Sequence, residues 1–465
     1  MRFAVRLAAL SAALANLAAA PPSDPLTALA AANGHPAAVH FRASASRVIE
    51  GRTVTTTFDQ LGATELIERC VAGVCGGIWF DGARSWTFGL NEVALPEAVD
   101  DATRLRRTLA AIVSYAFAEP AFRAAGGTVN AAGPSRWRVR AAAGAELIAI
   151  ADSATQSIAR VETAGGNPVA VYRRERRANG ATFALDRTDA DEIGPLESVV
   201  AVPGPLGPPA GSVPAFGAQA PLALAAEPVP IVPCTVGGRR VRCLIDSGTT
   251  PSAVTLSLAE SLKLEPHGEI EISGFSRFAT GFIETGPLDL GAAHFTSARF
   301  AVVPPSNALH FDVIVGSDLL GRLRLVLDRR LGTASVSPPG GTAAANAVAL
   351  TFRSGSPMLA AQVGPEPVSA LLDTGDDAVV SMGYALYRQG PQWPLLARGF
   401  ATGLAGTADD FTIEVPDVRI GSLTLGPTRT LVRRTQVEPH IGIGLWTRFV
   451  IDLDEQAERI RFGSR

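Results

Sequence analysis

Two aspartates in the second half of the chain stand in the same local sequence. Asp246 begins Asp-Ser-Gly and Asp373 begins Asp-Thr-Gly, and each follows two aliphatic residues. Two carboxylates held about 3 Å apart cannot both ionise easily, so they share a proton and can serve as acid and base in one reaction. The glycine of each motif permits the sharp turn that such an approach needs. The pattern therefore indicates acid–base chemistry on a pair of aspartates.

Both motifs belong to an internal duplication. A shift of 127 residues places residues 221–248 over residues 348–375 without a gap. Further along, Ile314-Val315-Gly316 recurs as His440-Ile441-Gly442, so the spacing from aspartate to glycine is 316 − 246 = 70 in one copy and 442 − 373 = 69 in the other. A repeat of this length indicates two similar structural units.

The repeated core resembles the aspartic proteases of the retropepsin and pepsin type, over residues 221–465. The resemblance implies a mainly β fold, with a pair of β-barrel lobes at residues 221–340 and 346–465. It implies Asp246 and Asp373 as an intramolecular catalytic dyad that activates a water to hydrolyse peptide bonds. It also implies a peptide or protein substrate, no cofactor, no metal and a monomer, since one chain carries both halves of the site.

The resemblance extends to the loops beside the two aspartates. Ser247 and Thr374 match hydroxyls that brace the two loops against each other, and Gly248 and Gly375 match the turn glycines. Thr249 matches a hydroxyl bonded to the catalytic carboxylate, but its counterpart is Asp376. A third carboxylate there would raise the proton affinity of the cluster, and would either shift the pH optimum or spoil the site. Asp377 matches an acidic position that meets substrate backbone in retropepsins.

A hairpin flap is expected about thirty residues after each aspartate, where the family places it. The tetrapeptide Phe-Ala-Thr-Gly occurs near both positions, within the glycine-bounded segments 274–282 and 399–406. Glycine boundaries suit a moving hairpin, although ordinary surface hairpins are the alternative. The candidate flap residues are Phe278, Thr280, Gly281, Phe400, Thr402 and Gly403.

Other chemistries find little support in the composition. The formal charge is 41 − 44 = −3, which argues against nucleic acid as a partner. Lys263 is the single lysine and follows no glycine-rich loop, so nucleotide chemistry is not indicated. The histidines, His440 included, lie at no metal-ligand spacing, and we interpret them as structural or solvated. Gly-x-Ser-x-Gly and His-Glu-x-x-His motifs are both missing from the sequence.

The first residues predict export. Residues 1–20 carry two arginines, an apolar run too short to span a bilayer comfortably and a closing Ala-Ala-Ala, which is typical of a signal peptide. An uncleaved amphipathic leader is the alternative. We expect a periplasmic or secreted protein with no integral membrane segment after signal removal.

The four cysteines form two close pairs, Cys70 with Cys75 and Cys234 with Cys243. A four-residue loop at 237–240 would place the second pair face to face across a hairpin. Each pair could form a disulfide in an oxidising compartment. Free buried thiols and a four-thiolate zinc site are the alternatives.

Residues 21–195 predict a separate antiparallel sheet that holds one helix, which the recurrence of apolar residues places from Pro96 to before Pro120. A linker rich in proline and glycine follows at 196–220. We interpret residues 21–195 as an accessory domain, with an inhibitory pro-segment as an alternative. For the whole chain, the rival to an endopeptidase is a non-catalytic peptide-binding or scaffold protein that retains the bilobal fold.

Overall fold

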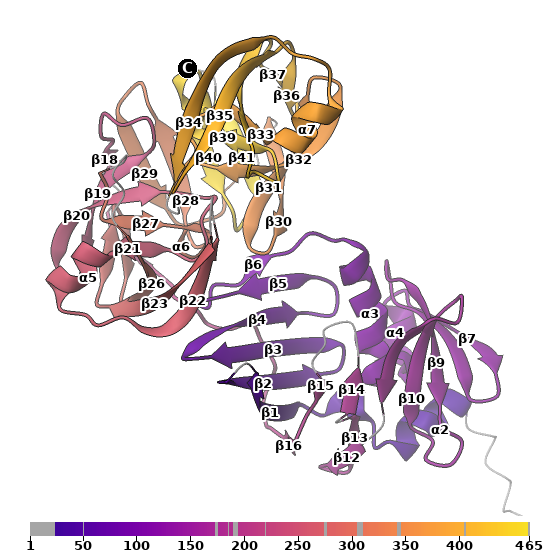
Figure 1. Cartoon of the computed structure of the whole chain (residues 1–465). Coiled ribbons are helices and arrows are strands. Elements are labelled where there is room, and N and C mark those ends of the chain that lie inside the picture. The colour runs from indigo at the N-terminus through magenta and orange to yellow at the C-terminus, as the bar shows by residue number, and fades with distance from the viewer. Residues whose placement is uncertain are drawn as a thin grey trace, which may run out of the picture. The chain divides into compact units, whose positions relative to one another are not determined.

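The computed structural model describes residues 24–463 except 50, 173–174, 185, 189–193, 219, 274–276, 305–309, 342–345 and 404–405 (Figure 1). The fold is mainly β, as the sequence predicted. The described residues divide into two compact units. The first takes them from residues 1–44, 59–64 and 101–206, and the second from residues 45–58, 65–100 and 207–465. Residues 45–58 and 65–100 thus belong to the same unit as residues 207–465.

The first unit is an antiparallel sheet packed against helices. Its strand order is β15-β14-β11-β10-β9-β8-β7. Leu109 and Ile112 of helix α3 pack with Val139, Leu147 and Val161 of the sheet in one buried core. The helix begins at Asp101 rather than at Pro96, because Pro96 lies in strand β6. The bounds of these elements are α2 Pro25–Ala32, η1 Pro36–Ala38, α3 Asp101–Val113, η2 Ala116–Ala118, α4 Pro120–Ala124, β7 Thr128–Gly133, β8 Arg136–Arg140, β9 Glu146–Ala151, β10 Ile158–Thr163, β11 Pro168–Tyr172, β12 Glu175–Ala178, β13 Ala181–Ala184, β14 Asp186–Thr188, β15 Gly194–Pro195 and β16 Ser198–Ala201.

The second unit contains two lobes with the same strand order. We call residues 231–320 the first lobe and residues 356–447 the second lobe. Their sheets run β24-β19-β20-β27-β21-β26-β23-β22 and β36-β31-β32-β39-β33-β38-β35-β34, so the duplication seen in the sequence is a duplication of topology. Each lobe buries aliphatic and aromatic side chains in a continuous core.

The elements of the first lobe are β19 Ile231–Val236, β20 Arg239–Ile245, β21 Ala253–Thr255, α5 Leu256–Leu262, β22 His267–Ser273, β23 Arg277–Thr285, β24 Leu288–Leu290, β25 Ala293–Phe295, β26 Ala298–Val303, β27 Val313–Val315 and α6 Ser317–Leu320. Those of the second lobe are β31 Ser356–Val363, β32 Glu366–Asp373, β33 Val380–Gly383, α7 Tyr384–Gln389, β34 Leu395–Gly403, β35 Gly406–Val415, β36 Val418–Ile420, β37 Leu423–Thr424, β38 Thr428–Arg433, β39 His440–Gly442 and η3 Ile443–Thr447.

The repeated glycine segment explains how each lobe presents its aspartate. Strand β27 lies between β20 and β21, parallel to the first and antiparallel to the second. The chain between β20 and β21 therefore cannot close as a simple hairpin, and it projects Asp246 from the end of β20. Gly316 follows β27, where an added Cβ would lie 2.3 Å from the carbonyl oxygen of Thr249. Gly442 meets the carbonyl of Ala378 at the same distance, 2.3 Å, so both positions admit glycine alone.

A six-stranded sheet joins the two lobes, in the order β18-β29-β28-β40-β41-β30. At its centre β28 pairs with β40 so that Leu325 lies opposite Leu453 and Leu327 opposite Ile451. The central pair is Val326 and Asp452, and 452 − 326 = 126 equals the offset between the two repeat glycines, 442 − 316 = 126. The pairing of β28 with β40 is therefore symmetric about the Val326–Asp452 pair. The bounds are β18 Leu222–Ala223, β28 Arg324–Asp328, β29 Thr333–Ser337, β30 Ala347–Arg353, β40 Val450–Asp454 and β41 Arg459–Gly463. Strand β17, Ala215–Phe216, pairs instead with β25 in the sheet of the first lobe.

Residues 65–100 make polar contacts with the first lobe and with the turn between β30 and β31. Asn91 donates to a carboxylate oxygen of buried Asp318 at 2.7 Å. Glu97 accepts the backbone N–H groups of Ser354 and Gly355, at 3.2 and 3.1 Å. The remaining strands of the amino-terminal half are β1 Phe41–Ile49, β2 Arg52–Leu61, β3 Thr64–Val71, β4 Val74–Phe80, β5 Ser85–Phe88 and β6 Leu95–Pro96.

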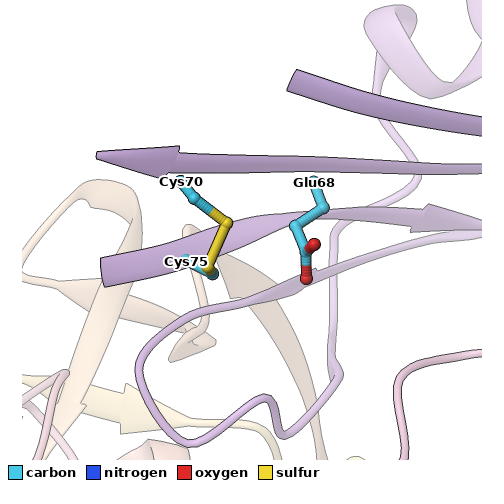
Figure 2. Close-up of side chains that lie close together, drawn as sticks. All are labelled: Glu68, Cys70 and Cys75. Carbon is cyan, nitrogen blue, oxygen red and sulfur yellow. A yellow bond between two sulfur atoms is a disulfide. The ribbon is translucent and has the colours of Figure 1, made fainter. Parts of the chain in front are cut away.

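Both cysteine pairs are disulfides. Cys70 and Cys75 lie directly opposite each other on β3 and β4, as Figure 2 shows, with Glu68 on the same strand as Cys70. The second pair is not face to face, because Gly237 and Gly238 form a two-residue turn with positive φ at both positions. Cys234 consequently lies opposite Val241, and its disulfide reaches diagonally to Cys243 with a Cα separation of 5.9 Å.

The described helices are short or polar. Among the residues that the structure describes, we find no helix with the length and hydropathy needed to cross a membrane.

We expect the Cys234–Cys243 disulfide to stabilise the first lobe measurably. Replacing both cysteines by alanine removes a constraint that closes a loop over a sequence separation of 9. The expected loss is about 2 to 3 kcal/mol of unfolding free energy, measured by urea denaturation. Both side chains are buried, so alanine avoids an unsatisfied hydroxyl. An unchanged midpoint relative to the parent protein would contradict the prediction.

Candidate active site

The two aspartate loops meet between the lobes. A Cβ added to Gly248 would lie 2.6 Å from the carboxyl carbon of Asp373, and one added to Gly375 would lie 2.5 Å from the carboxyl carbon of Asp246. Each carboxyl group thus packs on the glycine of the opposite loop. Each also accepts the N–H of its own glycine, at 3.0 Å for Asp246 Oδ1 and 2.9 Å for Asp373 Oδ1. This reciprocal packing brings the two carboxyl groups together.

Hydroxyl groups join the loops beneath the carboxyls. Thr374 Oγ1 accepts the N–H of Ser247 at 2.9 Å and donates to the carbonyl of Ile245 at 2.8 Å. Ser247 Oγ accepts the N–H of Thr374 at 3.2 Å and donates to the carbonyl of Leu372 at 2.7 Å. Both side chains are fully buried. Because each hydroxyl both donates and accepts, four bonds hold the loops with no unsatisfied group.

The Oδ2 atoms of the two carboxyl groups, which we call the outer oxygens, have different partners. Thr249 donates its hydroxyl to Asp246 Oδ2 at 2.6 Å. The counterpart residue, Asp376, contributes only its backbone N–H to Asp373, at 3.1 Å to Oδ1. The Asp376 side chain accepts from Arg433 at 2.8 and 3.0 Å and from Ser381 at 2.7 Å. Its negative charge is therefore paired within the second lobe.

His440 occupies the place beside the outer oxygen of Asp373. Its Nδ1 lies 3.0 Å from Asp373 Oδ2 and 3.6 Å from Asp376 Oδ2. These are ion-pair contacts rather than aligned hydrogen bonds, since no described acceptor lies along the N–H direction. From the sequence, His440 was interpreted as structural or solvated, and its place beside Asp373 was not predicted. The repeat alignment held the signal, because it places His440 over Ile314, next to the glycine segment.

The protonation of the site is asymmetric. Burial and the nearby charge of Asp373 raise the pKa of Asp246 to about 8. Burial alone would raise the pKa of Asp376, but His440, Arg433 and Ser381 hold it well below its usual range. Burial would lower the pKa of His440, yet contacts with Asp373 and Asp376 raise it to about 9. Neighbouring titratable groups whose pKa values are shifted in opposite directions are typical of acid–base sites.

The cluster of Asp373, Asp376 and His440 offers three ligand atoms within 4.8 Å of one another. Both Asp376 oxygens lie on the Arg433 guanidinium, so the cluster is a network of ion pairs and we assign no metal to it. Glu68, Cys70 and Cys75 form a similar group, but the two sulfur atoms are joined in the disulfide of Figure 2.

The candidate flaps are hairpins, β22–β23 and β34–β35. Phe278, Thr280 and Gly281 lie on the second strand of the first hairpin, where Phe278 packs on the core and Thr280 donates to the carbonyl of Val302. Residues 274–276 of its tip lie outside the described residues.

In the second hairpin, Phe400, Thr402 and Gly403 lie on the first strand. Phe400 is 73% exposed. The two Phe-Ala-Thr-Gly segments therefore occupy opposite arms of their hairpins, and the likeness between them does not mark equivalent positions. Asp377 follows Asp376 and its side chain is exposed.

Arg433→Val should destabilise the second lobe, because it leaves the buried Asp376 carboxylate without its cation. An uncompensated buried charge costs about 3 to 5 kcal/mol of unfolding free energy. The difference in unfolding free energy between parent and variant should shrink as the pH falls below about 4. The pKa of Asp376 is lower in the folded parent than in the unfolded chain, so the ionised carboxylate stabilises the parent only at a pH above the pKa of the unfolded chain. Asp376→Thr combined with Arg433→Val should recover most of the loss. Chemical denaturation at pH 7 and at about pH 3 measures both effects, and equal stability of parent and single variant at pH 7 would refute the assignment.

Residues 232–319 match the family model described as aspartyl protease. The matched range contains Asp246 and Gly316 and ends before Asp373. A search of curated proteins finds no match. The match supports an aspartic protease family, and with it a hydrolase acting on proteins in general.

Proposed function

We propose that the chain is an exported aspartic endopeptidase in which Asp246 and Asp373 act as one intramolecular dyad. The observation that carries the proposal is the reciprocal packing of each carboxyl group on the glycine of the opposite loop. Such packing favours a pair that holds one proton between two carboxyls, which is the arrangement that water-mediated amide hydrolysis needs.

Hydrolysis of a peptide bond by this pair requires few other groups. A water bound by both carboxyls would lose a proton to one of them as it attacks the peptide carbonyl, while the other gives its proton to the carbonyl oxygen. The Ser247–Thr374 bonds would hold the carboxyls in position through both steps. The hairpins β22–β23 and β34–β35 are the candidate flaps that would cover a bound peptide.

The arrangement is that of two retropepsin-like lobes in one chain. The identical strand orders of the two lobes and the symmetric register of β28 with β40 support this reading. A single chain then supplies the whole site, so a monomer suffices for activity.

Export is supported by the sequence of residues 1–20, which lie outside the described residues, and by the two disulfides. A periplasmic or secreted location follows. Residues 21–195 would then act as an accessory region. Their role as a removable pro-segment is less favoured, because residues 65–100 share a compact unit with the lobes.

Asp246→Asn and Asp373→Asn should each lower kcat on a peptide library by at least about a hundredfold, since each removes a partner in proton transfer. Asp289→Asn, an exposed aspartate of the first lobe, is the control and should cleave like the parent. A parent protein that binds peptides but cleaves none between about pH 3 and 8 would favour the scaffold alternative.

Cleavage should persist at neutral pH. The dyad must keep one shared proton, and the pKa of Asp246 is raised to about 8, so kcat/KM should fall as the pH rises through about 8. A pH–rate profile on one cleaved peptide measures this limb. Loss of activity already above about pH 5 would contradict the expected proton affinity.

A further inference from the structure

The matching topology allows the surroundings of the two aspartates to be compared position by position. Ile314 pairs with Leu244 and lies opposite Ala253, whereas His440 pairs with Leu371 and lies opposite Ser381. By the same register, Val303 beside Thr255 corresponds to Arg433 beside Gly383. The second lobe therefore replaces Thr249, Ala253, Val303 and Ile314 of the first lobe by Asp376, Ser381, Arg433 and His440.

These four polar residues contact one another. Arg433 and Ser381 bind the Asp376 carboxylate, and Nδ1 of His440 lies 3.6 Å from it. Asp376 and Arg433 neutralise each other with side chains 2% and 9% exposed. Because Asp376 is already paired with Arg433, Asp373 is the carboxylate that pairs with a positively charged His440.

The four replacements change the partner of the outer carboxyl oxygen. In the first lobe, the Thr249 hydroxyl lies 2.6 Å from Asp246 Oδ2. In the second, His440 Nδ1 lies 3.0 Å from Asp373 Oδ2. A neutral donor on one side and an imidazolium on the other make the two halves of the pair electrostatically unequal.

We propose that His440 is a positioning residue that takes the place of the Thr249 hydroxyl in the second lobe and, as an imidazolium, places a positive charge beside Asp373, so that Asp373 is the base and Asp246 the acid. The inference rests on the proposed protease function. It assigns roles that the sequence leaves open.

The charges around His440 are consistent with a cation. Asp373 at the end of β32 and Asp376 in the following turn face it directly, and Ser381 on β33 is uncharged. Arg433 on β38 lies behind Asp376, with Asp377 and Asp410 near its guanidinium. Although burial opposes it, the two facing carboxylates raise the pKa of His440 to about 9.

The roles balance over one turnover. As water attacks, its proton passes to Asp373 and the proton of Asp246 passes to the carbonyl oxygen, which gives a neutral tetrahedral diol. As the C–N bond breaks, Asp373 gives its proton to the departing nitrogen and Asp246 takes a proton from the diol. Both residues return to their starting states.

The test converts the second lobe to the pattern of the first. His440→Ile, which installs the residue of position 314, should lower kcat roughly tenfold to a hundredfold, less than loss of the acid or base itself. The acid limb of the pH profile should move to higher pH, because the ionised dyad loses its neighbouring cation. Adding Asp376→Thr and Arg433→Val should restore at least part of kcat by supplying a hydroxyl. His294→Gln, at an exposed site, is the control and should behave like the parent.

A second measurement does not depend on activity. Titration of His440 by NMR, assigned by its absence in His440→Ile, should give a pKa near 9 in the parent and a clearly lower one in Asp373→Asn. A parent that cleaves nothing defeats the protease proposal, and the titration alone then decides the role of His440. The inference is overturned if His440 titrates near 6.5 in both proteins, or if His440→Ile keeps the parent kcat and acid limb.

Discussion

The candidate site depends on the packing of two short loops, those of Asp246 and Asp373, against each other. Each carboxyl group rests on the glycine of the other loop, and the Ser247 and Thr374 hydroxyls bond across the same junction. Any side chain at either glycine would displace a carboxyl group. Strands β27 and β39 separate the two strands that flank each aspartate loop, and the pairing of β28 with β40 links the two lobes.

The two lobes share a topology but not an electrostatic environment. The first lobe surrounds its aspartate with aliphatic side chains and one hydroxyl, while the second uses a buried network of Asp376, Arg433, Ser381 and His440. From the sequence, a third carboxylate at Asp376 was expected either to shift the pH optimum or to spoil the site. Because Arg433 neutralises it, the Asp376 carboxylate adds no net negative charge beside Asp373, and it forms a buried network with Arg433 and Ser381.

Much of this arrangement could be predicted from the sequence, because the repeat places Asp246 and Asp373 in identical contexts and apolar strands lead into both. The partners of Asp376 could not, since Arg433 lies 57 residues further along and approaches only through the pairing of β33 with β38. His440 was missed because a lone histidine carries no local pattern, and only its alignment with Ile314 in the repeat distinguishes it. The diagonal disulfide and the late start of α3 depended on turn geometry and on Pro96 joining a strand.

A crystal structure with a bound peptide, in which a hydroxyl-bearing carbon replaces the scissile amide, would show whether Asp246 and Asp373 bind one reacting water together. We expect this hydroxyl to lie within hydrogen-bond distance of both carboxyl groups, beneath the hairpins β22–β23 and β34–β35. A peptide bound away from the aspartates, or carboxyl groups too far apart to share the hydroxyl, would contradict this expectation.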